Sequence, residues 1–214
     1  MIKKNNLKEK KNFKEALENR LNGSKFRIMN ENMSSNQKFS TKDFIKYFEY
    51  YEKQIKKWPT TPNKLIYNEI NKTKNMVVGD LGCGKTKKIN QNHYLYDQFP
   101  CSEDVVKADI ENIPVENNFF DIVVCSLSIM KNNITKVIKE VNRILKVDGI
   151  FYYGELKSRI SSCSKLIEKL EKCGFKKEDV NSKQKCFIVF KFRKTNEVLD
   201  KLPDIKLDTF KYNK

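Results

Sequence analysis

The sequence predicts an α/β fold, in which a mainly parallel β-sheet is flanked by helices and follows a helical N-terminal extension. Between residues 75 and 193, short β-rich runs alternate with amphipathic stretches, the pattern of successive β-α-β units. The apolar run Val123-Val124-Cys125 suits a strand buried on both faces, as in parallel sheets. Before residue 75, apolar residues recur at helical spacing until Trp58-Pro59, where proline stops a helix.

Each element follows from local pattern. The extension carries one helical stripe, formed by Phe44, Ile45, Tyr47, Phe48, Tyr51 and Ile55. Strands are expected at Met76–Asp80, His93–Asp97, Val105–Ala108, Phe120–Ser126, Ile150–Gly154 and Cys186–Phe192. Helices are expected at Ile134–Lys146 and at Ile160–Cys173, the second ended by Gly174. The expected domains are a basic helical extension that covers substrate or cofactor (1–74), an α/β core (75–195) and an irregular tail (196–214).

Charge and cysteine usage narrow the function. The 214 residues contain 43 Lys and Arg against 27 Asp and Glu, a net charge of +16. Such an excess favours a nucleic-acid partner, because phosphates release counterions when basic residues bind them. Six scattered cysteines without a C-x-x-C and a single histidine predict reduced thiols, an intracellular setting and no metal site. No apolar run is long enough for a membrane span.

The most informative segment is Met76–Gly84, an apolar strand that ends in Asp80 and a G-x-G turn. Glycines there let the backbone approach a ligand, and the carboxyl edge of a parallel sheet is where α/β proteins bind ligands. Asp97 ends the next strand, where a carboxylate can accept hydrogen bonds from both hydroxyls of a ribose. Asp109 follows the third strand.

Three cofactor classes compete for this pattern. A dinucleotide site requires a third glycine where the chain has Lys87. The letters from Gly79 to Thr86 match a phosphate-binding P-loop, but Asp80 would then lie beside phosphates. An S-adenosylmethionine site uses one acid near the cofactor's amino-acid part, one at the ribose and one at the adenine amine, and all three acids are present. The alternative is that the acids are only polar strand ends.

Further segments resemble the ribosomal RNA-processing protein 8 family, also called nucleomethylin-like methyltransferases, over about residues 21 to 195. The segments are Phe26-Arg27 with Asn30-Glu31, Gln54–Pro59, Asp80–Gly84, Cys125–Met130 and Glu155–Arg159. The resemblance implies a Rossmann-like class I methyltransferase that is nucleolar, binds S-adenosyl-L-methionine and makes 1-methyladenosine in large-subunit ribosomal RNA.

Carried over residue by residue, the resemblance places the cofactor against Gly82, Asp97, Asp109, Ile110 and Cys125, with Asp80 and Gly84 shaping the pocket. Ile110 and Cys125 also suit ordinary core positions. The chain departs from the family at Phe48, where a histidine is usual, at Lys85, where an acid is usual, and at Lys131-Asn132 in place of Gly-Thr. These departures bear on cofactor affinity. No catalytic side chain is assigned.

Methylation of a ring nitrogen uses a lone pair that is already available, so orientation matters more than a general base. Ser126, Ser128 or Glu155 are candidates to contact the base, and Tyr50, Tyr51 or Trp58 to stack on it. For Trp58, a lid packed over the cofactor is the favoured alternative. The expected partners are ribosomal RNA and proteins of the pre-ribosomal particle. Two alternatives stay open: a methyltransferase acting on another RNA or a basic protein tail, and a non-catalytic RNA-binding scaffold. The RNA platform is expected at Arg27, Lys56 and Lys57 and at Lys3, Lys4, Lys8, Lys10, Lys11 and Lys14.

Overall fold

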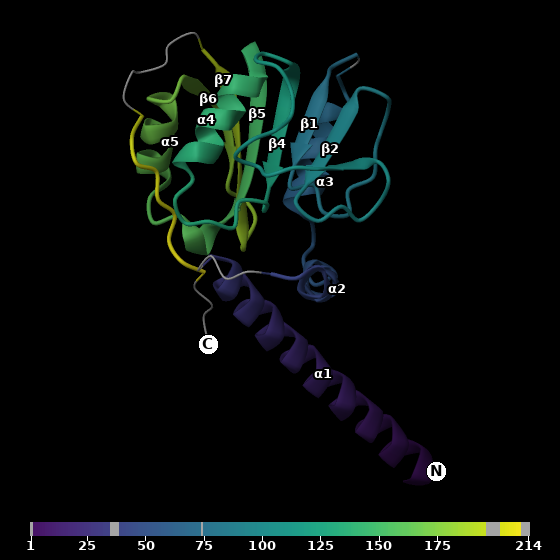
Figure 1. Cartoon of the computed structure of the whole chain (residues 1–214). Helices are drawn as coiled ribbons and strands as arrows, with labels where there is room; N and C mark the ends of the chain where they lie inside the picture. Colours follow the sequence, from purple (N-terminus) through teal and green to yellow (C-terminus); the bar gives the residue numbers. More distant parts are fainter. Residues whose placement is uncertain (1, 35–38, 74, 196–201, 211–214) are drawn as a thin grey trace. The chain divides into compact units, whose positions relative to one another are not determined.

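The chain forms two compact units, Met1–Pro59 and Thr60–Lys214. The computed structural model describes residues 2–34, 39–73, 75–195 and 202–210 (Figure 1). The expected boundary at residue 75 falls inside the second unit, because α3 (Pro62–Ile70) packs on the sheet. Each unit is described by itself below.

The first unit is helical, as expected. It contains α1 (Ile2–Ser34) and α2 (Thr41–Ile55). A capping box starts α2: Ser40 Oγ accepts the Asp43 N–H, and Asp43 Oδ2 accepts the Ser40 N–H. Tyr47 stacks on Phe26 of α1 with a ring separation of 5.7 Å. The predicted stripe is confirmed except at Ile45, which is 56% exposed because it lies one position off the buried face.

The second unit is built on one seven-stranded sheet with the order β3-β2-β1-β4-β5-β7-β6. The first five strands in this order run parallel, and β7 is antiparallel to both β5 and β6. The strands are β1 (Val78–Leu81), β2 (His93–Asp97), β3 (Val105–Lys107), β4 (Phe120–Ser126), β5 (Leu145–Leu156), β6 (Phe175–Asn181) and β7 (Phe187–Lys194).

All six predicted strands are present, and one was missed. β6 reads as polar because its four residues from Lys176 to Asp179 are exposed, and it is held at the sheet edge by backbone pairing with β7. β5 begins five residues earlier than predicted, because α4 (Thr135–Ile144) passes directly into it. The second predicted helix, Ile160–Cys173, is shorter in the structure, where α5 spans Cys163–Glu171. A separate 3-10 turn, Lys157–Arg159, lies just before the predicted start of that helix.

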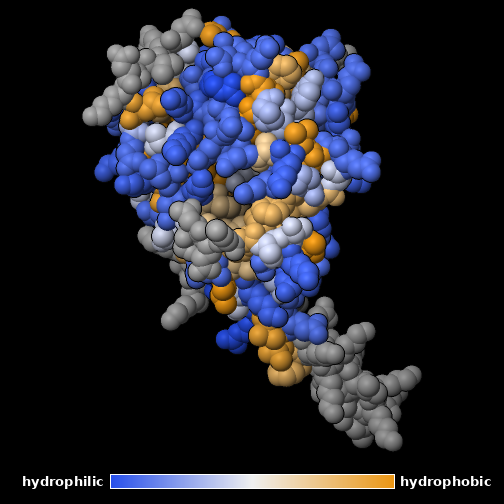
Figure 2. Space-filling model, viewed as in Figure 1, coloured by the Kyte–Doolittle hydropathy of each residue, from blue (hydrophilic) through white to orange (hydrophobic). Residues whose placement is uncertain are grey.

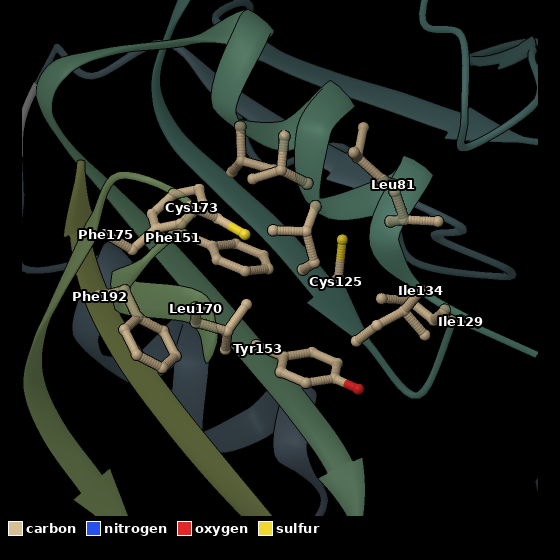
Figure 3. Close-up of a cluster of buried hydrophobic side chains, with 14 of the residues drawn as sticks. Leu81, Cys125, Ile129, Ile134, Phe151, Tyr153, Leu170, Cys173, Phe175 and Phe192 are labelled. Atoms are coloured by element: carbon tan, nitrogen blue, oxygen red, sulfur yellow. The ribbon is translucent and has the colours of Figure 1, made fainter. Parts of the chain in front are cut away.

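The two faces of the sheet have different covers. Phe151 and Tyr153 of β5 point into an apolar cluster with Leu170 of α5 (Figure 3). Ile138 of α4 belongs to the same cluster. The residue between Phe151 and Tyr153, Tyr152, points the other way and donates from its hydroxyl to Glu69 of α3 over 2.9 Å. Because side chains alternate along a strand, α3 covers one face and α4 with α5 the other.

Residues beyond β7 also pack on this core. Ile205 and Leu207 are buried, the Ile134 N–H donates to the Ile205 carbonyl and the Leu207 N–H donates to the Asn132 carbonyl. The tail expected to be irregular therefore includes, at residues 202–210, a segment that is anchored to the start of α4. Figure 2 shows hydrophilic side chains over most of the face that carries α4 and α5.

Candidate functional site

The carboxyl ends of β1 and β2 lie side by side at one edge of the sheet. The two strands pair in parallel, with Asp80 opposite Leu95 and Leu81 opposite Tyr96. The N–H groups of Gly82 and Cys83 both donate to the Tyr96 carbonyl, over 2.8 and 3.0 Å. The glycine turn is thus tied to β2 as soon as β1 ends, and no helix follows: the described residues 82–92 form turns and loop.

The two glycines of the turn are needed for its shape. Gly82 has φ 69° and Gly84 has φ 57°, in the left-handed region that favours glycine. A methyl group at Gly82 would also lie 2.4 Å from the Ser128 Cβ, in the loop after β4. The G-x-G motif therefore allows close packing of two loops at this edge, and the approach of a ligand to these glycines stays a prediction.

Asp80 is a buried carboxylate at the end of β1. It is 1% exposed, and the Tyr67 hydroxyl of α3 donates to its Oδ2 over 2.6 Å. Burial raises the pKa of Asp80 to about 7, although hydrogen bonds from Tyr67 and Thr86 act to lower it. The same burial, with the Asp80 charge nearby, raises the pKa of the Cys83 thiol. A buried carboxylate such as Asp80 favours a positively charged neighbour, because the positive charge stabilises its ionised form.

Asp97 closes the turn from the neighbouring strand. Its Oδ2 accepts the Gly84 N–H over 2.8 Å and its Oδ1 accepts the Phe99 N–H over 2.9 Å. Burial raises its pKa, and these backbone hydrogen bonds oppose the rise. The Gln98 backbone N–H also hydrogen-bonds this carboxylate. A carboxylate has about four lone-pair sites, so three backbone donors leave about one acceptor position for a ligand hydroxyl. Asp97 thus has a structural role in the turn that the sequence did not reveal.

The third acid lies in a turn rather than on a strand. Asp109 follows the end of β3 by two residues, is exposed, and accepts the Glu111 N–H over 2.9 Å. Ile110 is half-buried and packs against the main apolar cluster. The Ala108 N–H donates to the Asp97 carbonyl over 3.1 Å, which brings the start of this turn beside the second acid.

Cys125 is a core residue by its side chain. It is 0% exposed and lies with Leu81, Ile129 and Ile134 in the apolar cluster (Figure 3). Burial raises the pKa of its thiol, which excludes a thiolate at neutral pH. Its place in a cofactor site remains a prediction.

The end of β4 carries an unpartnered polar atom, and the loop that follows it carries strain. Leu127 has φ 54°, a conformation that costs energy for a residue with a side chain. The buried hydroxyl oxygen of Ser126 has no hydrogen-bond partner among the described residues. Strain and an unsatisfied polar group together favour a ligand-facing loop.

Glu155 cannot contact a substrate base, contrary to the expectation from sequence. It is 1% exposed, and Arg159 Nη1 donates to its Oε2 over 2.9 Å. The same guanidinium donates to the carbonyls of Ile129 and Lys131 over 2.6 and 2.9 Å. This buried ion pair therefore fixes the loop after β4 from the face covered by α4 and α5.

Two residues that the sequence did not single out belong to the site. Tyr67 of α3 contacts Asp80, and His93 Nε2 lies 3.0 Å from the Tyr67 hydroxyl. The sequence carries only weak signals for them: His93 is the sole histidine, and Tyr67 lies on the apolar side of a short helix.

The departures from the family fall in different places. Lys85 is exposed directly after the turn, and Lys131 forms an ion pair with Glu111 over 2.7 Å, which links the loop after β4 to the turn after β3. Phe48 belongs to the first unit and is buried there.

Most of the expected RNA contacts also belong to the first unit. Tyr51 packs against Phe26 and Tyr47 there, while Lys56 and Lys57 are exposed. The side chains of the six N-terminal lysines from Lys3 to Lys14 lie outside the part that the structure describes.

Two absences hold for the described residues. Histidine, cysteine and acidic side chains do not come together there in a group that could hold a metal ion. None of the described helices combines the length and apolar character that crossing a membrane requires.

Solved structures share the fold. A 1,6-didemethyltoxoflavin-N1-methyltransferase of Burkholderia thailandensis, solved with S-adenosylhomocysteine, matches 73% of this chain and 87% of its own with a TM-score of 0.54 at 15% identity. A TehB-like S-adenosylmethionine-dependent methyltransferase of Corynebacterium glutamicum matches 73% of this chain and all of its own, with a TM-score of 0.54 at 16% identity. The second unit therefore has the class I methyltransferase fold, as predicted.

Comparison with related sequences identifies the family more closely than comparison with solved structures does. A family described as hypothetical methyltransferase matches residues 12–214. Ribosomal RNA-processing protein 8 of Caenorhabditis elegans is 31% identical over 91% of this chain and 61% of its own length. The 25S rRNA (adenine(645)-N(1))-methyltransferase of Schizosaccharomyces pombe is 29% identical over 85% of this chain and 65% of its own. The chain spans about three fifths of the nematode relatives it matches. By these matches and its fold, the chain belongs to the ribosomal RNA-processing protein 8 family of methyltransferases.

Proposed function

We propose that this chain is an S-adenosyl-L-methionine-dependent methyltransferase that makes 1-methyladenosine in large-subunit ribosomal RNA during ribosome biogenesis. The observation that carries the proposal is the placement of two buried carboxylates, Asp80 and Asp97, on either side of the glycine turn at the sheet edge. The names of the relatives and the net charge of +16 support the choice of RNA.

The residues present fit this cofactor. The buried Asp80 carboxylate suits the ammonium of the amino-acid part, and the remaining acceptor position of Asp97 suits a ribose hydroxyl. Asp109, exposed in the next turn, has an oxygen available to an adenine amine. Gly82 and Gly84 supply the positive φ values that fold the turn back beside Asp97, with Ile110 and Cys125 completing the pocket in this proposal. The bound cofactor supplies an electrophilic methyl group.

The protein's share of the reaction is positioning. N1 of adenine has an available lone pair, so holding it in line with the methyl donor lowers the barrier without a general base. Ser126, whose buried hydroxyl oxygen lacks a partner, is placed to orient the base. Because a paired N1 is inaccessible, the target adenosine must be unpaired or flipped out of its helix.

RNA phosphates are expected on two basic surfaces, one in each unit: the first unit, and the loop of the second unit that carries Lys85, Lys87 and Lys88, which are exposed next to the glycine turn. Lysines on such surfaces bind phosphates without reading sequence, so affinity should fall steeply with salt. Pre-ribosomal particle proteins as partners and a nucleolar location accompany this function as part of the proposal.

Calorimetry with S-adenosylmethionine and S-adenosylhomocysteine tests cofactor binding. Asp97→Asn should weaken binding at least about tenfold, because a charge-assisted acceptor is lost. Asp121→Asn is the matched control: Asp121 also accepts a backbone N–H, from Val77 over 2.8 Å, but at the start of β4. Equal losses in both variants would contradict a cofactor role for Asp97.

Primer extension on large-subunit ribosomal RNA, after incubation with enzyme and cofactor, tests the substrate. A methyl group at N1 blocks base pairing, so a new stop one nucleotide before an adenosine is expected, and Asp97→Asn should abolish it. Cofactor binding without a stop would favour another RNA. A folded protein that binds RNA but no cofactor would favour the scaffold.

A further inference from the structure

A chain of hydrogen bonds runs from β2 through α3 to the buried acid of β1. His93 Nε2 lies 3.0 Å from the Tyr67 hydroxyl, and that hydroxyl lies 2.6 Å from Asp80 Oδ2. Both ends are buried, with His93 0% and Asp80 1% exposed. The proposed cofactor contact uses only Asp80, so the other two groups require an explanation.

The direction of proton donation follows from the second nitrogen of His93. The Ile89 N–H donates to His93 Nδ1 over 3.2 Å, so Nδ1 carries a lone pair and the proton of the neutral ring is on Nε2. Nε2 must then donate to the Tyr67 oxygen, and the Tyr67 hydroxyl donates to Asp80. Burial, with a smaller effect of Lys88, lowers the pKa of His93 to about 4, which keeps the ring neutral at pH 7.

A second hydroxyl reaches the same carboxylate. Asn63, one turn before Tyr67 on α3, donates from Nδ2 to Thr86 Oγ1 over 3.1 Å. The Thr86 hydroxyl hydrogen-bonds Asp80 and acts to lower its pKa. Both hydroxyls that serve Asp80 thus have their own oxygens occupied by donors, so both protons are directed at the carboxylate.

This arrangement counters the main hazard of a buried acid. Burial raises the pKa of Asp80 to about 7, so without donors the group would be protonated at neutral pH and could rotate. A protonated acid attracts a cation far less than a carboxylate does. Hydroxyls that hydrogen-bond the ionised form favour it and fix its orientation.

We propose that Tyr67 and His93 are positioning residues that keep the Asp80 carboxylate ionised and oriented toward the ammonium of the cofactor's amino-acid part. This inference rests on the proposed function. Tyr67 acts directly on Asp80, and His93 acts through Tyr67 by fixing the direction of its hydroxyl.

The test compares two tyrosines of the same helix interface. Tyr67→Phe removes a hydroxyl that α3 donates to Asp80, and Tyr152→Phe removes a hydroxyl that β5 donates to Glu69 of α3 over 2.9 Å. Both changes delete one tyrosine–carboxylate hydrogen bond between α3 and the sheet, and both keep the ring. Thermal unfolding of the two variants shows whether each is folded.

Calorimetry then uses two ligands, S-adenosylmethionine and 5′-methylthioadenosine, which lacks the amino-acid part. Tyr67→Phe should weaken S-adenosylmethionine binding about tenfold and leave 5′-methylthioadenosine binding unchanged, whereas Tyr152→Phe should change neither. Equal affinities for S-adenosylmethionine in wild type and Tyr67→Phe would overturn the inference and leave the proposed function standing. A wild-type protein that binds neither ligand would overturn both.

A pH series gives a further readout. The groups that face Asp80 are Tyr67, Thr86, Asp97 and the thiols of Cys83 and Cys125. Affinity for S-adenosylmethionine should decline as acid protonates Asp80. Loss of the Tyr67 hydrogen bond raises the pKa of Asp80, so the decline should begin at higher pH in Tyr67→Phe. A role in packing alone would leave the profile in place, which would contradict the inference.

The sole histidine allows a test without substitution. Nitrogen NMR of the wild type should show the Nε2–H form of His93, no titration near pH 6.5, and a shift of the Nε2 signal when S-adenosylmethionine binds. A ring protonated on Nδ1, or one that titrates near 6.5, would break the directed chain and overturn the role of His93. This measurement decides the question even where Tyr67→Phe fails to fold.

Discussion

The two faces of the sheet in the second unit bury different kinds of side chain. The face under α4 and α5 is an apolar cluster into which Phe151 and Tyr153 point, with one buried ion pair, Glu155–Arg159. The face under α3 buries His93 at the start of β2, and it buries Asp80 and Asp97 toward the carboxyl ends of β1 and β2. We infer that the apolar face under α4 and α5 supplies most of the stability. The face under α3 has less apolar packing because it buries charged groups that can bind a ligand.

The largest expected effect tests the apolar face. Phe151→Ala removes a fully buried ring that contacts the rings of Tyr153 and Phe175, and should lower the free energy of unfolding by about 3–5 kcal/mol through lost burial and a cavity. Urea unfolding measures the loss. Cofactor affinity of the protein that remains folded should stay unchanged; a selective loss of affinity would break the division between the faces.

Gly82→Ala is expected to have a smaller effect on stability and a larger one on binding. The new methyl group would meet the Ser128 Cβ at 2.4 Å, and the residue would keep a positive φ, which together should cost about 1–3 kcal/mol. Calorimetry should show S-adenosylmethionine binding weakened at least about tenfold, because the turn must shift. Normal affinity in this variant would mean that the turn does not line the site.

Asp80→Asn sharpens the comparison through pH. The folded state raises the pKa of Asp80 from 3.8 to about 7, so it holds the proton more tightly than the unfolded chain does. The stability that wild type owes to this group is therefore present at low pH and is lost as pH rises from about 4 to about 7.

Asparagine does not titrate, so the unfolding free energy of wild type minus that of Asp80→Asn should fall across this range. His93 contributes in the opposite sense, since its pKa is lowered and its stabilising effect is lost as pH falls from 6.5 toward 4. The subtraction removes that shared contribution. A difference that is flat with pH would contradict the buried state of Asp80. Urea titrations at several pH values measure it.

The smallest effect is expected where the chain departs from its family at the loop after β4. Lys131 pairs with Glu111 over 2.7 Å but is 45% exposed, so Lys131→Ala should cost less than about 1 kcal/mol and should do so mainly at low salt. Lys172→Ala is the matched control, since Lys172 pairs with Glu168 on the surface of α5. If Lys131→Ala alters cofactor affinity and Lys172→Ala does not, the Lys131–Glu111 ion pair holds the loop after β4 in the position that binding requires.

The sequence by itself determined the fold class and six of the seven strands, and it predicted that Asp80, Asp97 and the glycine turn lie together at one sheet edge. These features depend on local patterns: buried parallel strands need continuous apolar runs, and a tight turn needs glycine. β6 was not predicted because this edge strand is held by backbone hydrogen bonds to β7. Such hydrogen bonds do not require an alternating apolar pattern in the side chains.

Only the tertiary structure decided which polar groups meet. Tyr67, Asp80 and His93 are separated by 13 residues in each step and come from a helix and two strands, so no periodicity links them. Glu155 and Asp97, both acids at strand ends, took different roles because one meets a buried arginine and the other meets the backbone of the glycine turn. The protonation state of each carboxylate, and the groups that it can contact, therefore depend on its burial and its hydrogen-bond partners rather than on its residue type.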